Sequence, residues 1–141
     1  MYYKPLLIPL LIQVLLTFFV WYKMYVARIA EMKKKRIDPQ RVSTRAKGRE
    51  ELTDSAACAD NLMNQFEMPV LFFVAILLAL ILMWQDPLLV VLAWLYVTLR
   101  IVHCIIHTTY NNVMHRFWAY VLSCGVLLCM WIRLGWYMIS A

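Results

Sequence analysis

The sequence predicts an all-α integral membrane protein, built as an up-down bundle of four transmembrane helices. The composition is 64% hydrophobic and only 16% charged, with a mean hydropathy of +0.67, values outside those of soluble domains. The apolar residues also gather into four runs, each near the roughly 20 residues that a helix needs to cross a bilayer. These runs are 6–22, 68–84, 87–109 and 117–139.

We expect the spans to fill almost the whole chain, as one four-helix membrane domain over residues 1–141. Any site must then be built between spans or at their ends. The first span is interpreted as a true span and not as a signal peptide, because no small-residue cleavage site follows it. The predicted spans are about 5–30, 55–84, 87–109 and 113–140, with a basic loop over 33–54.

The basic loop predicts the orientation in the membrane. Eight of the 14 Lys and Arg residues lie in residues 33–49, KKKRIDPQRVSTRAKGR. Short loops rich in Lys and Arg stay in the cytoplasm, so we expect both termini on the opposite side, in a bacterial inner membrane. We expect the loop to contact anionic membrane lipids. Nucleic-acid binding is not expected, because this loop accounts for the net charge of +6 and no recognition fold fits the rest.

A turn at Asp86-Pro87 is expected to separate the second and third spans. Asp is a favoured N-cap and Pro a favoured first helical residue, so we predict antiparallel neighbouring spans joined by a tight turn. The second span is expected to begin near Asp54 or Ser55. Pro69 then lies inside it and predicts a kink at that point.

Two polar stripes run along these spans with helical spacing, so the members of each stripe share one side of a helix. Ionisable groups inside a membrane cost several kcal/mol unless they are paired or hydrated. We therefore expect the stripes to face each other across a polar cavity, with Glu67 and Arg100 as the simplest ion pair. Such a pair could also do no more than hold helices together. The stripes are Asp60, Asn64 and Glu67 on the second span and Arg100, His103 and His107 on the third.

Other polar residues near the spans have simpler interpretations. His115 and Arg116 begin the fourth span, where snorkelling or lipid contact is a sufficient role. Arg133 is expected to reach the outer interface and is assigned no chemistry. The four cysteines are interpreted as reduced packing residues.

The two histidines of the third span also suggest a metal site. His103 and His107, at i and i+4, could share one metal ion, with Asp60 or Glu67 completing its ligands. Histidines in a polar stripe are more often hydrogen-bonded wall residues, so we expect no metal.

The stripes resemble the signatures of the MAPEG family (membrane-associated proteins in eicosanoid and glutathione metabolism), and the similarity covers essentially the full chain. Asn64-x-x-Glu67 followed by Pro69 is similar to the Asn-x-x-Glu-then-Pro motif of that family. The second signature has the spacing Arg-x2-His-x3-Tyr-x8-Arg of the microsomal prostaglandin E synthase branch. In this chain it is Arg100-x2-His103-x3-His107-x8-Arg116. The resemblance points to a bacterial-type member.

The resemblance implies a homotrimer in which glutathione lies between adjacent subunits, at the cytoplasmic side of the bundle. Asn64 and Glu67 would hold the amide and amino groups of the tripeptide, and Arg116 would contact its thiol. His103 would form a wall of the same pocket, which Arg100 and His107 would share. Lys35 or Arg36 could meet a glutathione carboxylate from the neighbouring subunit.

The chemistry of glutathione fits such a set of residues. It carries two carboxylates and one ammonium, so its site needs several cations and one carboxylate. An arginine beside the sulfur would lower the thiol pKa and so supply a nucleophile at neutral pH. The implied function is a glutathione-dependent transferase or peroxidase acting on lipophilic electrophiles or lipid hydroperoxides, which would arrive from the membrane.

Two positions depart from the family pattern inside the expected pocket. Asp60 replaces the arginine four residues before the signature asparagine, and His107 replaces the tyrosine of the second signature. An alternative is therefore the same fold binding a different small molecule or a lipid headgroup without catalysis. A purely structural or interaction role is a further alternative.

Overall fold

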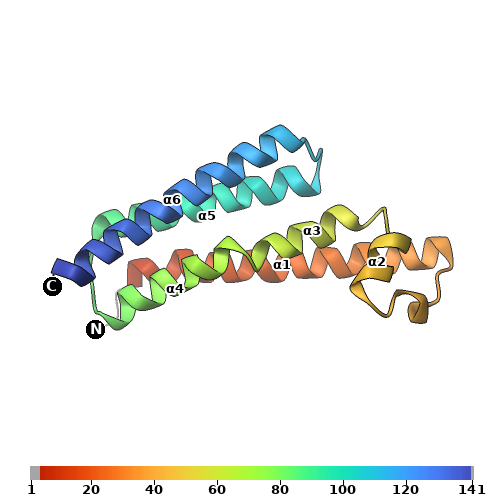
Figure 1. The fold of residues 1–141 in the computed structure, drawn as a ribbon, viewed down its shortest axis with the longest axis horizontal. Coiled ribbons are helices and arrows are strands. Elements are labelled where there is room, and N and C mark those ends of the chain that lie inside the picture. Colours follow the sequence, from red (N-terminus) through yellow and green to blue (C-terminus); the bar gives the residue numbers. More distant parts are fainter. Residues whose placement is uncertain (1–3, 141) are drawn as a thin grey trace.

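The computed structural model describes residues 4–140 and confirms the all-α membrane fold (Figure 1). Four helical spans are long and apolar enough to cross a membrane, and residues 4–140 contain no β-strand. The second span is divided into two helices, and two short elements lie between the first and second spans. The elements are α1 (Lys4–Lys35), the 3-10 helix η1 (Pro39–Val42), α2 (Arg45–Glu51), α3 (Ala56–Gln65), α4 (Met68–Ile81), α5 (Pro87–Thr108) and α6 (Val113–Ser140).

Side-chain caps explain where the last two spans begin. Asp86 is the N-cap of α5, and its carboxylate accepts a hydrogen bond of 3.0 Å from the backbone N–H of Leu88, as the Asp-Pro pair predicts. At the start of α6, the side-chain oxygen of Asn112 accepts from the backbone N–H groups of Met114 and His115 at 3.0 and 3.1 Å. These caps satisfy N–H groups that have no partner within the helix.

The second span is interrupted before Pro69, where the sequence predicted a kink. Proline has no N–H and its ring clashes with the carbonyl four residues earlier. For Pro69 that carbonyl belongs to Gln65, which is the last residue of α3. Glu67 then adopts a non-helical backbone with φ −98° and ψ −107°, and α4 begins at Met68. Glu67 therefore lies between the two helices, and its side chain is exposed.

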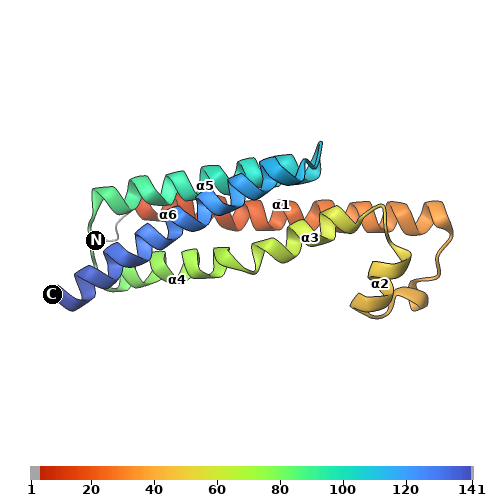
Figure 2. The same cartoon turned by 45° about the horizontal axis from the view of Figure 1, so that its top comes forward.

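The second and third spans are antiparallel neighbours only in part. The α3 helix packs against α5, but α4 packs against α6 and α1, as α5 does. Figures 1 and 2 show α4 and α5 at opposite corners of the bundle, with α6 and α1 between them. The predicted neighbour relationship is therefore wrong for α4. In the centre of the bundle the rings of Phe72 and Tyr96 stack at 4.6 Å, and they join the two helices across this diagonal.

A polar layer interrupts the apolar core near the middle of the bundle. Gln13 on α1 donates a hydrogen bond of 3.0 Å to the side chain of Gln65 at the end of α3, and both are buried. On the side of this layer that contains α4, the core is apolar and includes Phe72, Ile76 and Leu89. The four cysteines are free.

The basic segment 33–54 contains helical structure, because α1 continues to Lys35 and α2 folds back beside α1 and α3 (Figure 2). Buried Glu31 ties the end of α1 to the start of α3. Its carboxylate accepts hydrogen bonds from the backbone N–H groups of Asp54 and Ser55 at 2.9 and 2.8 Å, and also pairs with Lys35.

Candidate functional site

A polar cleft opens where the break between α3 and α4 faces α5 and the first turns of α6. Its volume is about 350 Å³. The cleft combines one carboxylate, one guanidinium, one imidazole, one amide and one phenol with two apolar side chains at its rim. The lining residues are Asn64, Glu67, His103, Val113, Arg116, Phe117 and Tyr120.

Glu67 presents a carboxylate to this cleft without a cationic partner in residues 4–140. Its one side-chain hydrogen bond is accepted from the hydroxyl of Tyr120 at 3.5 Å. Glu67 lies at the interruption between α3 and α4, and its side chain is exposed. The carboxylate is therefore available to a cationic group of a ligand.

Arg116 presents a guanidinium to the same cleft from the first turn of α6. Its Nη1 donates a hydrogen bond of 3.0 Å to the side-chain oxygen of Asn111, and no carboxylate of the described chain pairs with it. Asn111 adopts the left-handed conformation with φ 45°, which asparagine tolerates better than most residues. Glu67 and Arg116 thus offer opposite, unpaired charges to one shared space.

The predicted ion pair between Glu67 and Arg100 is wrong. Arg100 is fully buried, and its Nη2 donates a hydrogen bond of 2.8 Å to the backbone carbonyl of Asn64. Its guanidinium lies 5.7 Å from the ring centroid of Tyr120, in cation–π geometry. Arg100 therefore sits behind the cleft wall, and no carboxylate within residues 4–140 neutralises its charge.

The two histidines have different environments. Both are buried, but His103 lines the cleft and His107 does not, and the ring centroids lie 5.7 Å apart in an edge-on arrangement. No group of three or more His, Cys, Asp or Glu side chains in the described chain is arranged to hold a metal ion.

Three other predicted residues lie away from this cleft within one chain. Asp60 faces Arg49, 3.9 Å away, in a second cleft between α1, α2 and α3. Lys35 is engaged by Glu31 and by Asp54 at 3.3 Å, and Arg36 ends α1 in the left-handed conformation. The predicted stripe is thus divided between two clefts within α3: Asp60 lines one, and Asn64 lines the other together with Glu67.

Tyr120 is a cleft residue that the sequence analysis missed. It lies four residues after Arg116, so both side chains project from the same side of α6. This spacing was visible in the sequence. Its significance depends on the approach of α4 to α6, which the sequence did not reveal.

Comparison with protein families gives one match. The profile of the MAPEG family matches residues 6–136 and therefore covers all four spans and both polar signatures. No curated protein and no solved structure matched the chain.

Proposed function

Since the chain belongs to the MAPEG family, a family of membrane proteins that includes glutathione-dependent transferases and peroxidases, we propose that it binds glutathione in the cleft of Glu67 and Arg116. In this proposal the bound thiol reacts with lipophilic electrophiles or lipid hydroperoxides. The observation that supports it most strongly is the pair of opposite, unpaired charges facing one space.

Glutathione matches the cleft group by group. Its ammonium would bind the free carboxylate of Glu67, and its amide groups would bind the side chain of Asn64. Its thiolate would lie beside Arg116, with His103 as part of the wall. Arg100 would add positive potential from behind Tyr120, where burial reduces the screening of its charge.

The chemical step depends on the protonation state of the sulfur. A guanidinium beside a thiol stabilises the thiolate, which is the nucleophilic form. The thiolate would attack the electrophilic carbon of a second substrate and form a thioether as that carbon's leaving group departs or its double bond takes up a proton. With a hydroperoxide it would attack the terminal oxygen and break the O–O bond, so that the lipid leaves as an alcohol after protonation. A second glutathione would then convert the sulfenic acid of the first into the disulfide and water. Val113 and Phe117 line the rim and are 63% and 51% exposed, so an apolar substrate can approach the sulfur from the lipid.

We further propose that the chain acts as a homotrimer with its basic loop in the cytoplasm and both termini on the opposite side of a bacterial inner membrane. The whole chain would form the single membrane domain. In such an assembly Lys35 or Arg36 of a neighbouring subunit would approach a glutathione carboxylate. Arg36 is the freer of the two, because Lys35 is already paired with Glu31 and Asp54.

Isothermal titration of glutathione into detergent-purified protein tests the proposal. Charge-assisted hydrogen bonds contribute about 1.5–3 kcal/mol, so Arg116→Ala and Glu67→Gln should each weaken binding by about ten-fold or more. Arg41→Ala and Glu50→Gln are matched controls on the basic loop that line neither cleft, and they should bind as the wild type does.

A flat titration of well-folded wild-type protein would remove the proposal. Equal affinity in all five proteins would instead place glutathione elsewhere on the molecule. The flat titration would favour the alternative in which the fold binds another small molecule or a lipid headgroup.

A further inference from the structure

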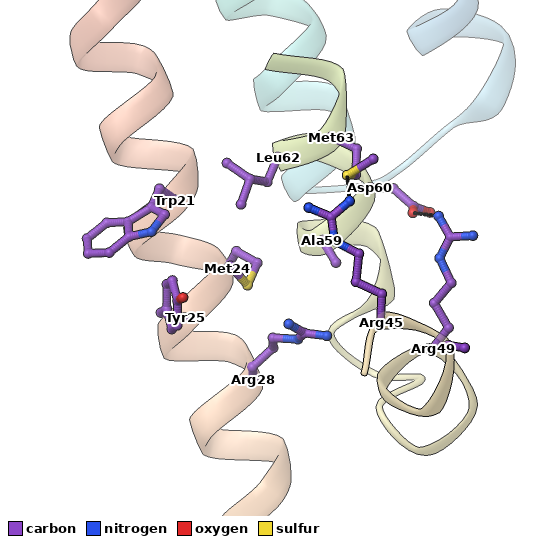
Figure 3. Close-up of a pocket in the computed structure, with 11 residues that line it drawn as sticks. Trp21, Met24, Tyr25, Arg28, Arg45, Arg49, Ala59, Asp60, Leu62 and Met63 are labelled. Atoms are coloured by element: carbon purple, nitrogen blue, oxygen red, sulfur yellow. Dashed lines mark hydrogen bonds and ion pairs between the residues drawn. The ribbon is translucent and has the colours of Figure 1, made fainter. Parts of the chain in front are cut away.

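A second and larger cleft lies between α1, α2 and α3. Its volume is about 650 Å³, within the range of small-molecule sites. Figure 3 shows Arg28 reaching into it from α1 and Arg45 from α2. Apolar and aromatic side chains form its other walls: Trp21, Met24 and Tyr25 on α1, and Leu62 and Met63 on α3.

The charges in this cleft do not balance within the described chain. Asp60 lies 3.9 Å from Arg49, so these two partly neutralise each other. Arg28 and Arg45 have no carboxylate partner among residues 4–140, and the buried Nε of Arg28 has no hydrogen-bond partner there. The cleft therefore holds two uncompensated guanidinium groups, which together select an anion.

Gly48 allows the Arg28 guanidinium to occupy this position. A Cβ atom at residue 48 would lie 2.8 Å from Nη2 of Arg28, which is too close. Gly48 is buried on α2, and its missing side chain leaves the space in which the guanidinium lies. Adding a methyl group would displace the flexible end of Arg28 without changing the charge of the protein.

The apolar and cationic walls are arranged along the axis of α1. Trp21 and Arg28 are separated by seven residues, or about 10 Å of helix. Trp21 lies on the side of the apolar span and Arg28 on the side of the basic loop. Trp21 and Tyr25 are about half exposed, which leaves the aromatic wall open to the surroundings. A ligand that follows this axis has an anionic end near the loop and an apolar end in the membrane.

We propose that this cleft binds an anionic phospholipid, with its phosphate between Arg28 and Arg45 and its glycerol and acyl region against Trp21 and Tyr25. Arginine binds phosphate oxygens through paired N–H groups. Glutathione fits less well, because the one carboxylate in the cleft, Asp60, already faces Arg49 and no long apolar body would cover the aromatic wall.

Native mass spectrometry of the full-length protein, released from detergent after titration with phosphatidylglycerol, measures this binding without glutathione present. Phosphatidylcholine with the same acyl chains and inorganic phosphate are the comparison probes. The test variants are Arg28→Gln/Arg45→Gln, which removes two charges, and Gly48→Ala, which removes none. The matched control is Lys33→Gln/Lys47→Gln, which removes two charges from the same two helices outside the cleft.

We expect phosphatidylglycerol to bind the wild type and the control about ten-fold more tightly than either test variant. Phosphatidylcholine should bind weakly to all four proteins, and inorganic phosphate should not displace the bound lipid.

Equal losses in the control and the double arginine variant would overturn the proposal, because they would indicate attraction to the loop as a whole. Displacement by inorganic phosphate at similar concentrations would also overturn it, since the site would then recognise a free anion. Retention of wild-type affinity by Gly48→Ala in folded protein would contradict the placement of the phosphate at Arg28.

Discussion

The hydroxyl of Tyr120 donates a hydrogen bond of 3.5 Å to the carboxylate of Glu67, which joins α6 to the break between α3 and α4. The ring of the same tyrosine lies 5.7 Å from the buried guanidinium of Arg100 and 5.8 Å from the ring of His103. One phenol thus separates an exposed carboxylate from a buried cation. This separation keeps Glu67 free for a ligand.

Tyr120→Phe tests whether this contact positions the carboxylate. The variant keeps the ring over Arg100 but loses the hydrogen bond, which is worth about 1 kcal/mol. We expect glutathione affinity to fall by about five-fold, measured by isothermal titration. Tyr22→Phe, at an exposed position on α1, is the matched control. Unchanged affinity in Tyr120→Phe would show that Glu67 needs no help from the phenol.

Asn111→Gly tests how Arg116 is held. Glycine accepts the left-handed backbone at this position, so the turn should fold, while the guanidinium loses its 3.0 Å partner. We expect the turnover rate with a model electrophile to fall more than glutathione affinity, because a mobile Arg116 stabilises the thiolate less. Steady-state kinetics measure both. An unchanged rate would mean that Asn111 does not position Arg116.

Much of this fold was accessible from the sequence because its signals are local. Apolar runs predict the spans, and the Asp86-Pro87 pair predicts the start of α5 with its cap. The polar signatures identified four residues that line the cleft, namely Asn64, Glu67, His103 and Arg116.

The errors arose where the outcome depends on contacts between helices. Helical spacing predicted that Asp60 and Glu67 lie on one side of a single helix. Pro69 has no N–H to donate to the carbonyl of Gln65, so the helix breaks after Gln65, and Glu67 lies outside α3. The predicted Glu67–Arg100 pair failed for the same reason. The folding of the basic loop onto α1 depends on buried Glu31, which local patterns do not reveal.

The hydrogen bond between Gln13 and Gln65 offers a test of the polar layer. Gln13→Leu should destabilise the protein by about 1 kcal/mol, because it leaves the buried side-chain oxygen of Gln65 without its hydrogen-bond donor. Gln13→Leu with Gln65→Leu should recover most of this loss. Unfolding in mixed micelles measures both values. A double variant less stable than the single would indicate that packing dominates over hydrogen bonding.

Acid should weaken the clamp between α5 and α6 formed by Asp86 and Arg133. Burial raises the pKa of Asp86, but the hydrogen bonds from Arg133 and from the backbone N–H of Leu88 outweigh this and hold the pKa below its ordinary value of 3.8. The lowered pKa means that the clamp contributes its full stability above about pH 3.8 and loses it as pH falls through the folded pKa.

Asp86→Asn isolates this contribution, because asparagine still caps α5 but carries no charge. Thermal unfolding in detergent should show the wild type more stable than the variant at neutral pH. The difference in stability should stay constant down to about pH 3.8 and shrink below it. A difference that stays constant with pH would exclude the ion pair as its source.

The most direct test of the cleft is the ultraviolet absorbance of the thiolate of bound glutathione, followed as a function of pH. Wild-type protein should hold glutathione as thiolate at neutral pH, well below the pKa of about 8.5 that is usual for a thiol. Arg116→Ala should return the titration toward that of free glutathione. A bound thiol that titrates like the free tripeptide in the wild type, or identically in wild type and Arg116→Ala, would contradict the assignment of Arg116.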